Sequence, residues 1–271
     1  MFNLQDLIRP NIKNLIPYSS ARDEFKGKEG TFMDANENSF GSPIGENLNR
    51  YPDPLQMELK EKIGRLKGVI PSRIFLGNGS DEAIDILFRA FCNPGKDNVI
   101  IVPPTYGMYE VAANINDVNC IKINLTGEFQ LNVKGLLDSI NPDTKLIFLC
   151  CPNNPTGTSL KAGDIKNILT NFQGIVVLDE AYIDFANYKS LTSELDNYPN
   201  LVILQTLSKA WGLASLRLGM AFASEEIIDV FNKIKPPYNI SGQTQQLVLK
   251  ALDNHKQINK WINEIKSEKK N

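Results

Sequence analysis

The amino-acid sequence predicts an α/β fold, in which a mainly parallel sheet has helices on both faces to give three layers. Short apolar runs of strand length alternate with helical stretches, a rhythm that is typical of parallel sheets with both faces covered. Polar motifs directly follow several of these runs, and in open α/β sheets the ligands lie beyond the carboxyl ends of the strands. The predicted strands are Asn98–Val102, Cys120–Leu125, Leu146–Cys151, Ile175–Leu178, Leu201–Gln205 and Leu218–Ala223.

Helices and an extended arm surround this alternating region. Residues 1–45 contain frequent proline and glycine, so they predict an arm with little regular structure of its own. Leucine and isoleucine recur at helical spacing over residues 54–67. A glycine-rich turn at residues 77–79 then leads into a predicted helix over Ser80–Phe91. The last stretch, residues 243–270, is helical and increasingly charged.

Composition and charge exclude several classes of protein. The 29 Lys and Arg residues against 31 Asp and Glu residues leave no basic excess of the kind that binds nucleic acid. The apolar runs are far shorter than the roughly 20 residues that span a membrane, and the start shows no signal-peptide pattern. We therefore expect a cytoplasmic protein with small-molecule partners. A single histidine, His255, and four cysteines without ligand spacing argue against histidine-based catalysis and a bound metal.

Four polar side chains follow predicted strands in order along the chain: Asn154, Asp179, Tyr182 and Lys209. Each of them has an ordinary structural explanation. An asparagine before a proline forms turns, an aspartate caps helices, and a lone lysine is usually a solvated surface charge. The four taken together are far more informative than any one of them.

As a set, these side chains meet the chemical requirements of pyridoxal 5'-phosphate. The ring nitrogen of this cofactor must stay protonated to draw electrons from a substrate carbanion, and a carboxylate such as Asp179 enforces that state. The cofactor aldehyde must be held by an amine made reactive by desolvation and nearby cations, which is the role that suits Lys209. The ring oxygen needs hydrogen-bond donors, and Asn154 and Tyr182 supply an amide and a phenol.

The cofactor phosphate needs its own binding groups, and three parts of the sequence offer them. The turn before residue 80 leads into a helix, whose first N–H groups and dipole favour an anion, although alone it is better explained as an ordinary helix cap. A serine and an arginine near Lys209 add a hydroxyl and a fixed cation. A tyrosine after another strand could cover the ring face or pack in the core. These residues are Gly79, Ser80, Asp81, Ser208, Arg217 and Tyr106.

Three motifs in this order resemble those of the fold-type-I aminotransferases, and their combination and spacing are specific to that superfamily. They are NNPTG at Asn153–Gly157, DEAY at Asp179–Tyr182 and SKAWGLASLRLG at Ser208–Gly219. Five further segments are similar to those of one group within it, the histidinol-phosphate aminotransferases. They are PYSSAR at Pro17–Arg22, DANEN at Asp34–Asn38, NRYPDP at Asn49–Pro54, GNGSDE from Gly77 and PPTYGMY from Pro103.

The resemblance implies a pyridoxal-phosphate-dependent enzyme of histidine biosynthesis. It would transfer the amino group of L-histidinol phosphate to 2-oxoglutarate in a ping-pong reaction that gives imidazole acetol phosphate and glutamate. Lys209 would carry the cofactor and move a proton between substrate and cofactor. The resemblance further implies a homodimer with a shared active site, in which Tyr51 reaches the cofactor phosphate from the partner subunit. Tyr18 and Asn36 would face the substrate.

The resemblance also implies a division of the chain into three parts. Residues 1–45 would form the arm and part of a small domain, residues 46–242 the large cofactor-binding domain, and residues 243–271 the start of the helix that leads to a small C-terminal domain. Because that domain carries substrate-binding arginines and is expected to be missing here, we expect cofactor binding to exceed turnover. Two alternatives stay open: a related enzyme acting on aromatic amino acids or decarboxylating threonine phosphate, and a cofactor-binding fragment without turnover.

Overall fold

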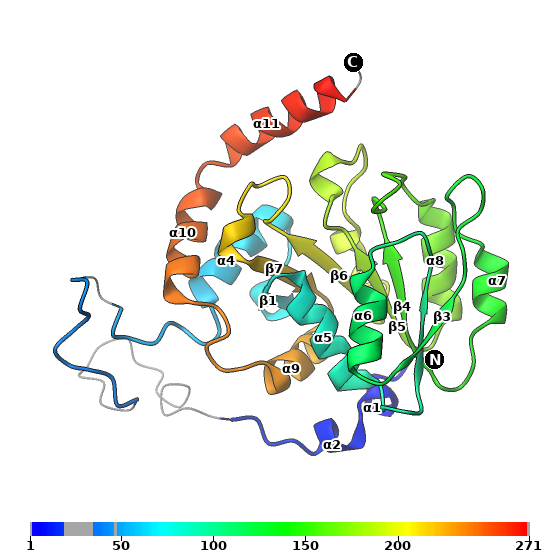
Figure 1. Ribbon diagram of the computed structural model, residues 1–271, viewed down its shortest axis with the longest axis horizontal. Helices are drawn as coiled ribbons and strands as arrows, with labels where there is room; N and C mark the ends of the chain where they lie inside the picture. The colour runs from blue at the N-terminus through cyan, green and yellow to red at the C-terminus, as the bar shows by residue number, and fades with distance from the viewer. Residues whose placement is uncertain (1, 19–34, 46–47, 270–271) are drawn as a thin grey trace.

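The computed structural model describes residues 2–18, 35–45 and 48–269, and this part of the chain forms an α/β fold around a seven-stranded sheet (Figure 1). The strands are β1 (Ile74–Asn78), β2 (Asn98–Ile101), β3 (Asn119–Lys122), β4 (Thr144–Cys150), β5 (Ile175–Asp179), β6 (Leu201–Thr206) and β7 (Leu218–Phe222). The α-helices are α1 (Leu4–Leu7), α2 (Pro10–Lys13), α4 (Met57–Lys67), α5 (Ser80–Phe91), α6 (Met108–Ile115), α7 (Val133–Asp138), α8 (Ala162–Asn171), α9 (Glu225–Ile234), α10 (Gly242–Leu252) and α11 (His255–Glu268). Short 3-10 helices span Pro71–Arg73, Ile183–Phe185, Leu191–Glu194 and Ala214–Leu216.

The strand order places the carboxyl ends of most strands along one edge of the sheet. The order is β1-β7-β6-β5-β4-β2-β3. Strand β7 pairs antiparallel with β1 and β6, and all other neighbours pair in parallel. Every strand except β7 therefore runs in the same direction, which confirms the prediction of a mainly parallel sheet.

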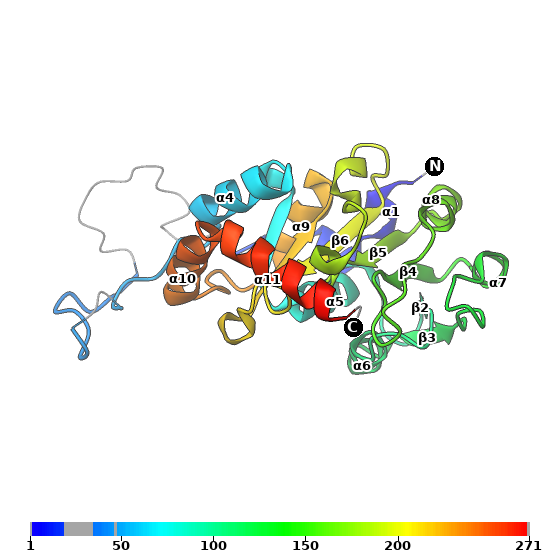
Figure 2. The same ribbon diagram turned by 90° about the horizontal axis from the view of Figure 1, so that it is seen from above.

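Helices cover both faces of this sheet, as the two perpendicular views show (Figures 1 and 2). Strand β4 illustrates why. Leu146 and Phe148 pack into the layer that includes α5, α6 and α9, whereas Ile147 and Leu149 pack into the layer that includes α4, α8 and α10. Successive strand side chains point to opposite faces, so a strand that is apolar at every position requires cover on both.

All six predicted strands are present, with small shifts at their ends, and the helix over Ser80–Phe91 is confirmed. One difference concerns the glycine-rich turn: Gly77 and Asn78 belong to β1, which leaves Gly79 as the turn residue. Gly77 pairs with Gly219 in β7, and a Cβ at Gly77 would lie 2.9 Å from the Phe75 ring. The glycine at position 77 therefore serves close packing of the sheet rather than the turn.

Two predicted helices have different limits in the structure. The helix expected over residues 54–67 begins at Met57, because the Asp53 carboxylate accepts the Met57 N–H at 2.7 Å and Gln56 adopts a left-handed conformation. The stretch over residues 243–270 forms two helices, α10 and α11, with a break at Asp253 and Asn254. Asparagine and aspartate compete for backbone hydrogen bonds, which favours a helix end at this position.

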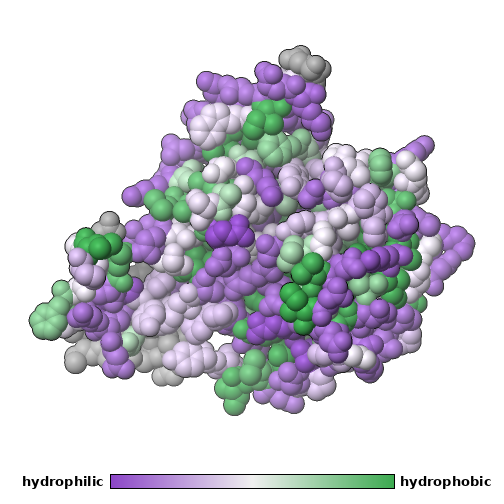
Figure 3. All heavy atoms as spheres, viewed as in Figure 1, coloured by the Kyte–Doolittle hydropathy of each residue, from purple (hydrophilic) through white to green (hydrophobic). Residues whose placement is uncertain are grey.

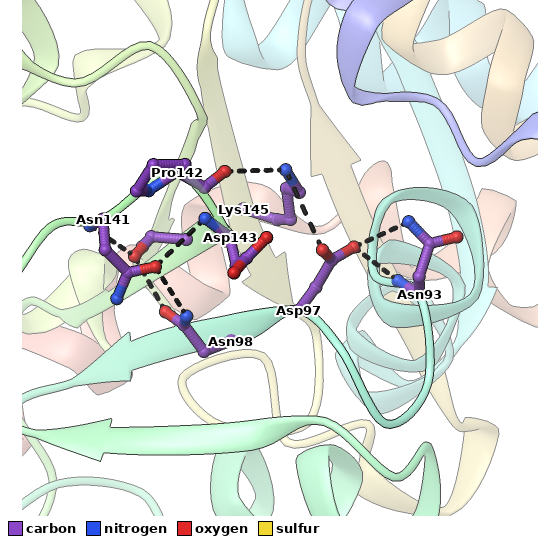
Figure 4. Close-up of polar contacts among 8 residues, drawn as sticks. Asn93, Asp97, Asn98, Asn141, Pro142, Asp143 and Lys145 are labelled. Atoms are coloured by element: carbon purple, nitrogen blue, oxygen red, sulfur yellow. Dashed lines mark hydrogen bonds and ion pairs between the residues drawn. The ribbon is translucent and has the colours of Figure 1, made fainter.

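Polar side chains pair with one another at the opposite edge of the sheet, where β2 and β4 begin (Figure 4). The Thr144 hydroxyl donates to Asn98 Oδ1 at 2.8 Å. The Lys145 ammonium lies 3.9 Å from the buried Asp97 carboxylate, which also accepts two N–H bonds from Asn93. These contacts hold strands and loops together at this edge, whereas the polar side chains that follow the strands lie at the carboxyl ends.

The surface of the described chain is mixed in polarity. The face in Figure 3 is mainly hydrophilic, with apolar side chains gathered in separate patches. Several large apolar side chains of the N-terminal segment are strongly exposed, among them Ile16 at 89%, Phe40 at 101% and Ile44 at 69%. No helix in residues 2–18, 35–45 and 48–269 combines the length and the apolar character needed to cross a membrane.

Asn200, the residue before β6, provides a test of how this fold is held together. Its buried Nδ2 donates to the carbonyls of Leu169, Phe172 and Gly174 at 3.1, 3.1 and 3.3 Å. We expect Asn200→Ala to lower the free energy of unfolding in urea by about 2 kcal/mol, because buried carbonyls lose their donor. Asn197→Ala, at an exposed position, should lower it by less than about 0.5 kcal/mol. Equal losses in both variants would contradict this assignment.

Candidate active site

Side chains from several strand ends meet at the carboxyl edge of the sheet. Asn154 follows β4, Asp179 is the last residue of β5, and Lys209 follows β6. Because β7 runs antiparallel, its start lies at the same edge, and Arg217 directly precedes it. The sheet thus gathers residues that are far apart in the sequence.

These side chains line one cavity of about 210 Å³. Its lining residues are Gly79, Ser80, Asp81, Tyr106, Cys150, Asn154, Asp179, Ala181, Tyr182, Thr206, Ser208, Lys209 and Arg217. Every residue predicted to bind the cofactor is in this set, with the exception of Tyr51. The structure therefore brings together residues that the sequence places in five separate segments.

Asp179 is the buried charge of the cavity, with an exposed fraction of 3%. Its Oδ2 accepts the Tyr109 hydroxyl at 2.6 Å, and its Oδ1 accepts the Ala181 N–H at 3.0 Å. Burial raises the pKa of the Asp179 carboxyl, and these two hydrogen bonds oppose the rise. A cation placed beside Asp179 would favour its charged form.

Lys209 and Tyr182 lie together in the cavity lining. The Lys209 Nζ is 5.5 Å from the centre of the Tyr182 ring, within the range of a cation–π contact. The expectation of a desolvated amine is not met in the described chain, where Lys209 is exposed. It lies three residues beyond the end of β6, where the main chain has left the sheet. Asn154 is partly buried in the same lining, on the loop after β4.

The start of α5 lies against Arg217, an arrangement suited to an anion. Gly79 adopts φ 77°, and its N–H donates to the Arg217 carbonyl at 2.6 Å. A Cβ at Gly79 would lie 2.7 Å from Arg217 Nη2, and a Cβ at Gly219 would lie 2.1 Å from the Ser80 nitrogen. Both glycines are therefore required for this close approach. The helix has no side-chain cap, so the N–H groups of its first turn are available to an anion.

Asp81 and Tyr106 form a second pair in the lining. The Tyr106 hydroxyl donates to Asp81 Oδ1 at 3.2 Å, and Asp81 Oδ2 lies 3.7 Å from Arg217 Nη2. Burial and the neighbouring Asp81 carboxylate raise the pKa of Tyr106 to about 12, so its hydroxyl remains a donor. Nearby, the hydroxyls of Thr206 and Ser208 lie 3.0 Å apart. The ring of Tyr106 and the Ser208 hydroxyl are thus both fixed at the cavity.

Three predicted residues, Tyr51, Tyr18 and Asn36, lie outside this cavity. Tyr51 is half exposed and stacks on Tyr238, with ring centroids 4.5 Å apart. Asn36 and Tyr51 line a second cavity together, and Tyr18 lines another one beside residues 232–237. Their roles in binding cofactor and substrate stay predictions. Residues 19–22 of the PYSSAR segment and Asp34 of the DANEN segment lie outside the described residues.

Sequence reasoning missed four residues at the site. Cys150, Ala181 and Thr206 line the cavity, and Tyr109 hydrogen-bonds to Asp179. Cys150 and Thr206 are the last residues of strands β4 and β6. Their positions at strand ends could therefore have predicted that they line the site. Cys150 is a free, buried thiol, and burial raises its pKa to about 12. It therefore contributes a neutral surface rather than a nucleophile.

The donor set fits pyridoxal 5'-phosphate. Asp179 offers a buried carboxylate to a ring nitrogen, and Lys209 offers an amine to an aldehyde. The start of α5, together with Ser208 and Arg217, offers hydrogen bonds and positive charge to a phosphate dianion, and the glycine at position 79 leaves room for that approach. In contrast, no group of three or more His, Cys, Asp or Glu residues within the described ranges could hold a metal ion.

Comparison with known sequences gives a consistent result. The model of the family "Aminotransferase class I and II" matches residues 31–271. The chain is 59% identical over 253 residues to a histidinol-phosphate aminotransferase of Cytophaga hutchinsonii, which covers 93% of this chain and 73% of that protein. It is 57% identical over 269 residues to a histidinol-phosphate aminotransferase of Parabacteroides distasonis, with 99% and 77% covered. The chain thus spans about three quarters of the length of these relatives.

Comparison with solved structures supports the same fold. The crystal structure of histidinol-phosphate aminotransferase from Sinorhizobium meliloti, in complex with pyridoxal-5'-phosphate, superposes with a TM-score of 0.76. The two sequences are 24% identical, and the match covers 85% of this chain and 66% of the other. At 24% sequence identity, this similarity shows a shared fold and nothing more.

The charge of Asp179 leads to a prediction on stability in the absence of cofactor. Because burial raises its pKa, the folded chain binds this proton more tightly than the unfolded chain. The stability that the protonated Asp179 carboxyl contributes is fully present below its pKa in the unfolded chain, which is about 3.9. This stability is lost as the pH rises through the higher pKa of the same carboxyl in the folded chain. Asp179→Asn removes that loss, so its melting temperature should exceed that of the cofactor-free wild type at pH 8, and the gain should shrink towards pH 4.

The control for this measurement is Asp138→Asn, whose carboxylate is largely exposed with a side-chain exposure of 62%. It should give no comparable gain at pH 8, because an exposed carboxylate is ionised at little cost in either state. A melting temperature of Asp179→Asn below that of the wild type at pH 8 would show that the Asp179 charge is well compensated in the folded chain.

Proposed function

The chain belongs to the class I and II aminotransferase family, and from that premise we propose that it transfers the amino group of L-histidinol phosphate to 2-oxoglutarate with pyridoxal 5'-phosphate. The products would be imidazole acetol phosphate and glutamate, in histidine biosynthesis. One observation carries the proposal: Lys209, Asp179, Arg217 and the start of α5 line one cavity. The identity of 59% to a relative with this name supports the choice of substrate.

The cofactor, when bound, supplies an electron-withdrawing ring that stabilises negative charge on the substrate carbon. The task of Asp179 is to hold a proton on the ring nitrogen, because a buried carboxylate strongly favours a cation beside it. This arrangement costs the protein stability in the absence of the cofactor, a common feature of active sites. The charge of Asp179 is therefore better explained by catalysis than by folding.

Lys209 Nζ is the group that would form and break the bond to the cofactor and would transfer the proton of the substrate carbon. It would hold the cofactor aldehyde before the substrate amine replaces it, and then accept the proton that leaves the substrate carbon and deliver it to the cofactor carbon. Both Lys209 and the Tyr182 ring, whose centre is 5.5 Å from the amine, line the cavity. A cation–π contact of this kind contributes about 0.5–1 kcal/mol at exposed sites.

The remaining lining residues orient the cofactor. Asn154 and Tyr182 would donate hydrogen bonds to the ring oxygen, and Tyr106 would cover one ring face. Gly79, Ser80 and Asp81 at the start of α5 would surround the phosphate together with Ser208 and Arg217. Anchoring the phosphate at one end and the ring nitrogen at the other leaves the reactive carbon in a fixed position.

A homodimer is the assembly that we propose, with Tyr51 reaching the cofactor phosphate of the partner subunit. Tyr51 is half exposed and does not line the cavity of its own chain. The exposed apolar residues Ile16, Phe40 and Ile44 belong to the same N-terminal segment and would gain from burial against a second copy. Tyr18 and Asn36 would face the substrate. The division at residues 46 and 242 and the cytoplasmic location stay predictions.

The function is tested by the first half-reaction, followed by absorbance after the purified chain is loaded with pyridoxal 5'-phosphate. We expect L-histidinol phosphate to convert the bound aldehyde to the amine form, and 2-oxoglutarate to restore it. Phenylalanine should react at least roughly tenfold more slowly, a difference of about 1.4 kcal/mol in transition-state binding. Lys209→Ala should show neither the lysine-bound absorption band nor conversion.

Three other outcomes would each point to a different function. Faster conversion by an aromatic amino acid would favour an aromatic aminotransferase, and release of carbon dioxide from threonine phosphate would favour a decarboxylase. A cofactor that binds but is not converted by any amine would favour a cofactor-binding fragment without turnover. Cofactor-free protein that folds but never binds pyridoxal 5'-phosphate would contradict the proposal altogether.

A further inference from the structure

A buried phenol lies directly behind the carboxylate of the site. Tyr109, on α6, has no exposed surface, and its hydroxyl donates to Asp179 Oδ2 at 2.6 Å. The ring stacks on Phe148, with centroids 4.8 Å apart, and meets Tyr106 edge to face at 5.5 Å. The packing fixes the ring, and the fixed ring aims the hydroxyl at the carboxylate. Seventy residues of sequence separate the two partners of this bond.

The groups around Asp179 make this one bond unusually important. Its other acceptor oxygen receives the Ala181 N–H, a main-chain donor. Besides Tyr109, the charged and titratable side chains that act on Asp179 include Asp81 from α5, Cys150 from β4, Lys209 from the loop after β6 and Tyr106 from the segment before α6. Asp81 and the burial favour the neutral acid, whereas Lys209 favours the anion. Within the described residues, Tyr109 is the side chain whose hydrogen bond opposes neutralisation of Asp179.

The proton of this hydrogen bond belongs to the phenol. Burial and the charge of Asp179 raise the pKa of Tyr109 well above 10, so its hydroxyl stays protonated at any working pH. Cys150, the other titratable neighbour of both groups, is also neutral, because burial raises its pKa to about 12. Tyr109 is therefore a permanent donor, and a donor to a carboxylate stabilises the ionised form.

We propose that Tyr109 is a positioning residue of the reaction, which acts through Asp179 by keeping its carboxylate ionised and oriented towards the ring nitrogen of the cofactor. The proposal rests on the proposed function. Asp179 and the ring nitrogen compete for one proton, and reaction requires that it stay on the nitrogen. Without the Tyr109 donor, the carboxylate binds that proton more strongly, and the ring draws fewer electrons from the substrate carbon.

The first experiment follows the Asp179 carboxyl directly, in chain prepared with [13Cγ]aspartate and without cofactor. The Asp179 resonance is assigned from its loss in Asp179→Asn. In Tyr109→Phe, which keeps the ring and its packing, we expect the titration midpoint of Asp179 to move to higher pH. Tyr188→Phe is the matched control. It removes a hydroxyl that lies 2.9 Å from Cys151 Sγ and does not contact Asp179, so the midpoint should stay that of the wild type.

The second experiment measures the effect on cofactor and reaction. With [15N]pyridoxal 5'-phosphate bound, the ring-nitrogen resonance of Tyr109→Phe should shift towards that of unprotonated pyridine. The kcat should fall about tenfold, as expected for the loss of a hydrogen bond to a charged group, while KM changes less than about twofold. In an Asp179→Asn background, Tyr109→Phe should cause no further loss of cofactor affinity, because the residue acts through Asp179.

Three results would overturn the proposal, and the first two are an unchanged Asp179 midpoint in Tyr109→Phe and a raised midpoint with an unchanged ring-nitrogen resonance in the loaded protein. A further loss of affinity in the Asp179→Asn background would do so as well, since it would show that Tyr109 acts by another route. The carboxyl titration uses no cofactor and no substrate. A raised midpoint in a chain that fails to transaminate would therefore count against the proposed function and leave the coupling of Tyr109 to Asp179 intact.

Discussion

The buried negative charge of Asp179 is the constraint on which the rest of the site depends. A carboxylate that is 3% exposed at the end of a central strand needs a counter-charge or strong donors, because an ionised group is costly to remove from water. The chain supplies a phenol behind it, an amide N–H beside it and an open cavity in front of it. Lys209 in the cavity lining favours the ionised form of Asp179, and a protonated cofactor ring beside the carboxylate would favour it further.

The topology of the sheet explains how the other groups reach this charge. Parallel strands bring Asn154, Asp179 and Lys209 to one edge, each from the loop or residue that ends a strand. Strand β7 runs antiparallel to its neighbours, so its start lies at the same edge. Arg217 therefore reaches the site from the position before a strand. Gly219, two residues after Arg217 in β7, lets the start of α5 lie against that strand, so the groups proposed to bind the cofactor ring and the phosphate are held by one sheet. The site is therefore a property of the sheet edge as a whole.

The sequence was sufficient for the features that depend on local pattern. The order of the strands along the chain, the helix over Ser80–Phe91 and ten of the thirteen residues that line the cavity follow from apolar periodicity, from polar residues after strands and from the motifs. The sequence did not predict features that depend on contacts between segments far apart in the chain. Tyr109 was unpredictable as a partner of Asp179, because a buried aromatic residue on a helix is usually core packing. The exposure of Lys209 likewise depends on how the loop after β6 leaves the sheet.

We propose that this sheet edge holds pyridoxal 5'-phosphate through Lys209 and through no other lysine. The most direct test is borohydride reduction of the loaded chain, followed by proteolysis and mass spectrometry of the labelled peptide. The account predicts one phosphopyridoxyl group per chain, on Lys209. A label on another lysine, such as Lys266 or Lys269 beside the neighbouring cavity, or a label spread over many surface lysines, would contradict it.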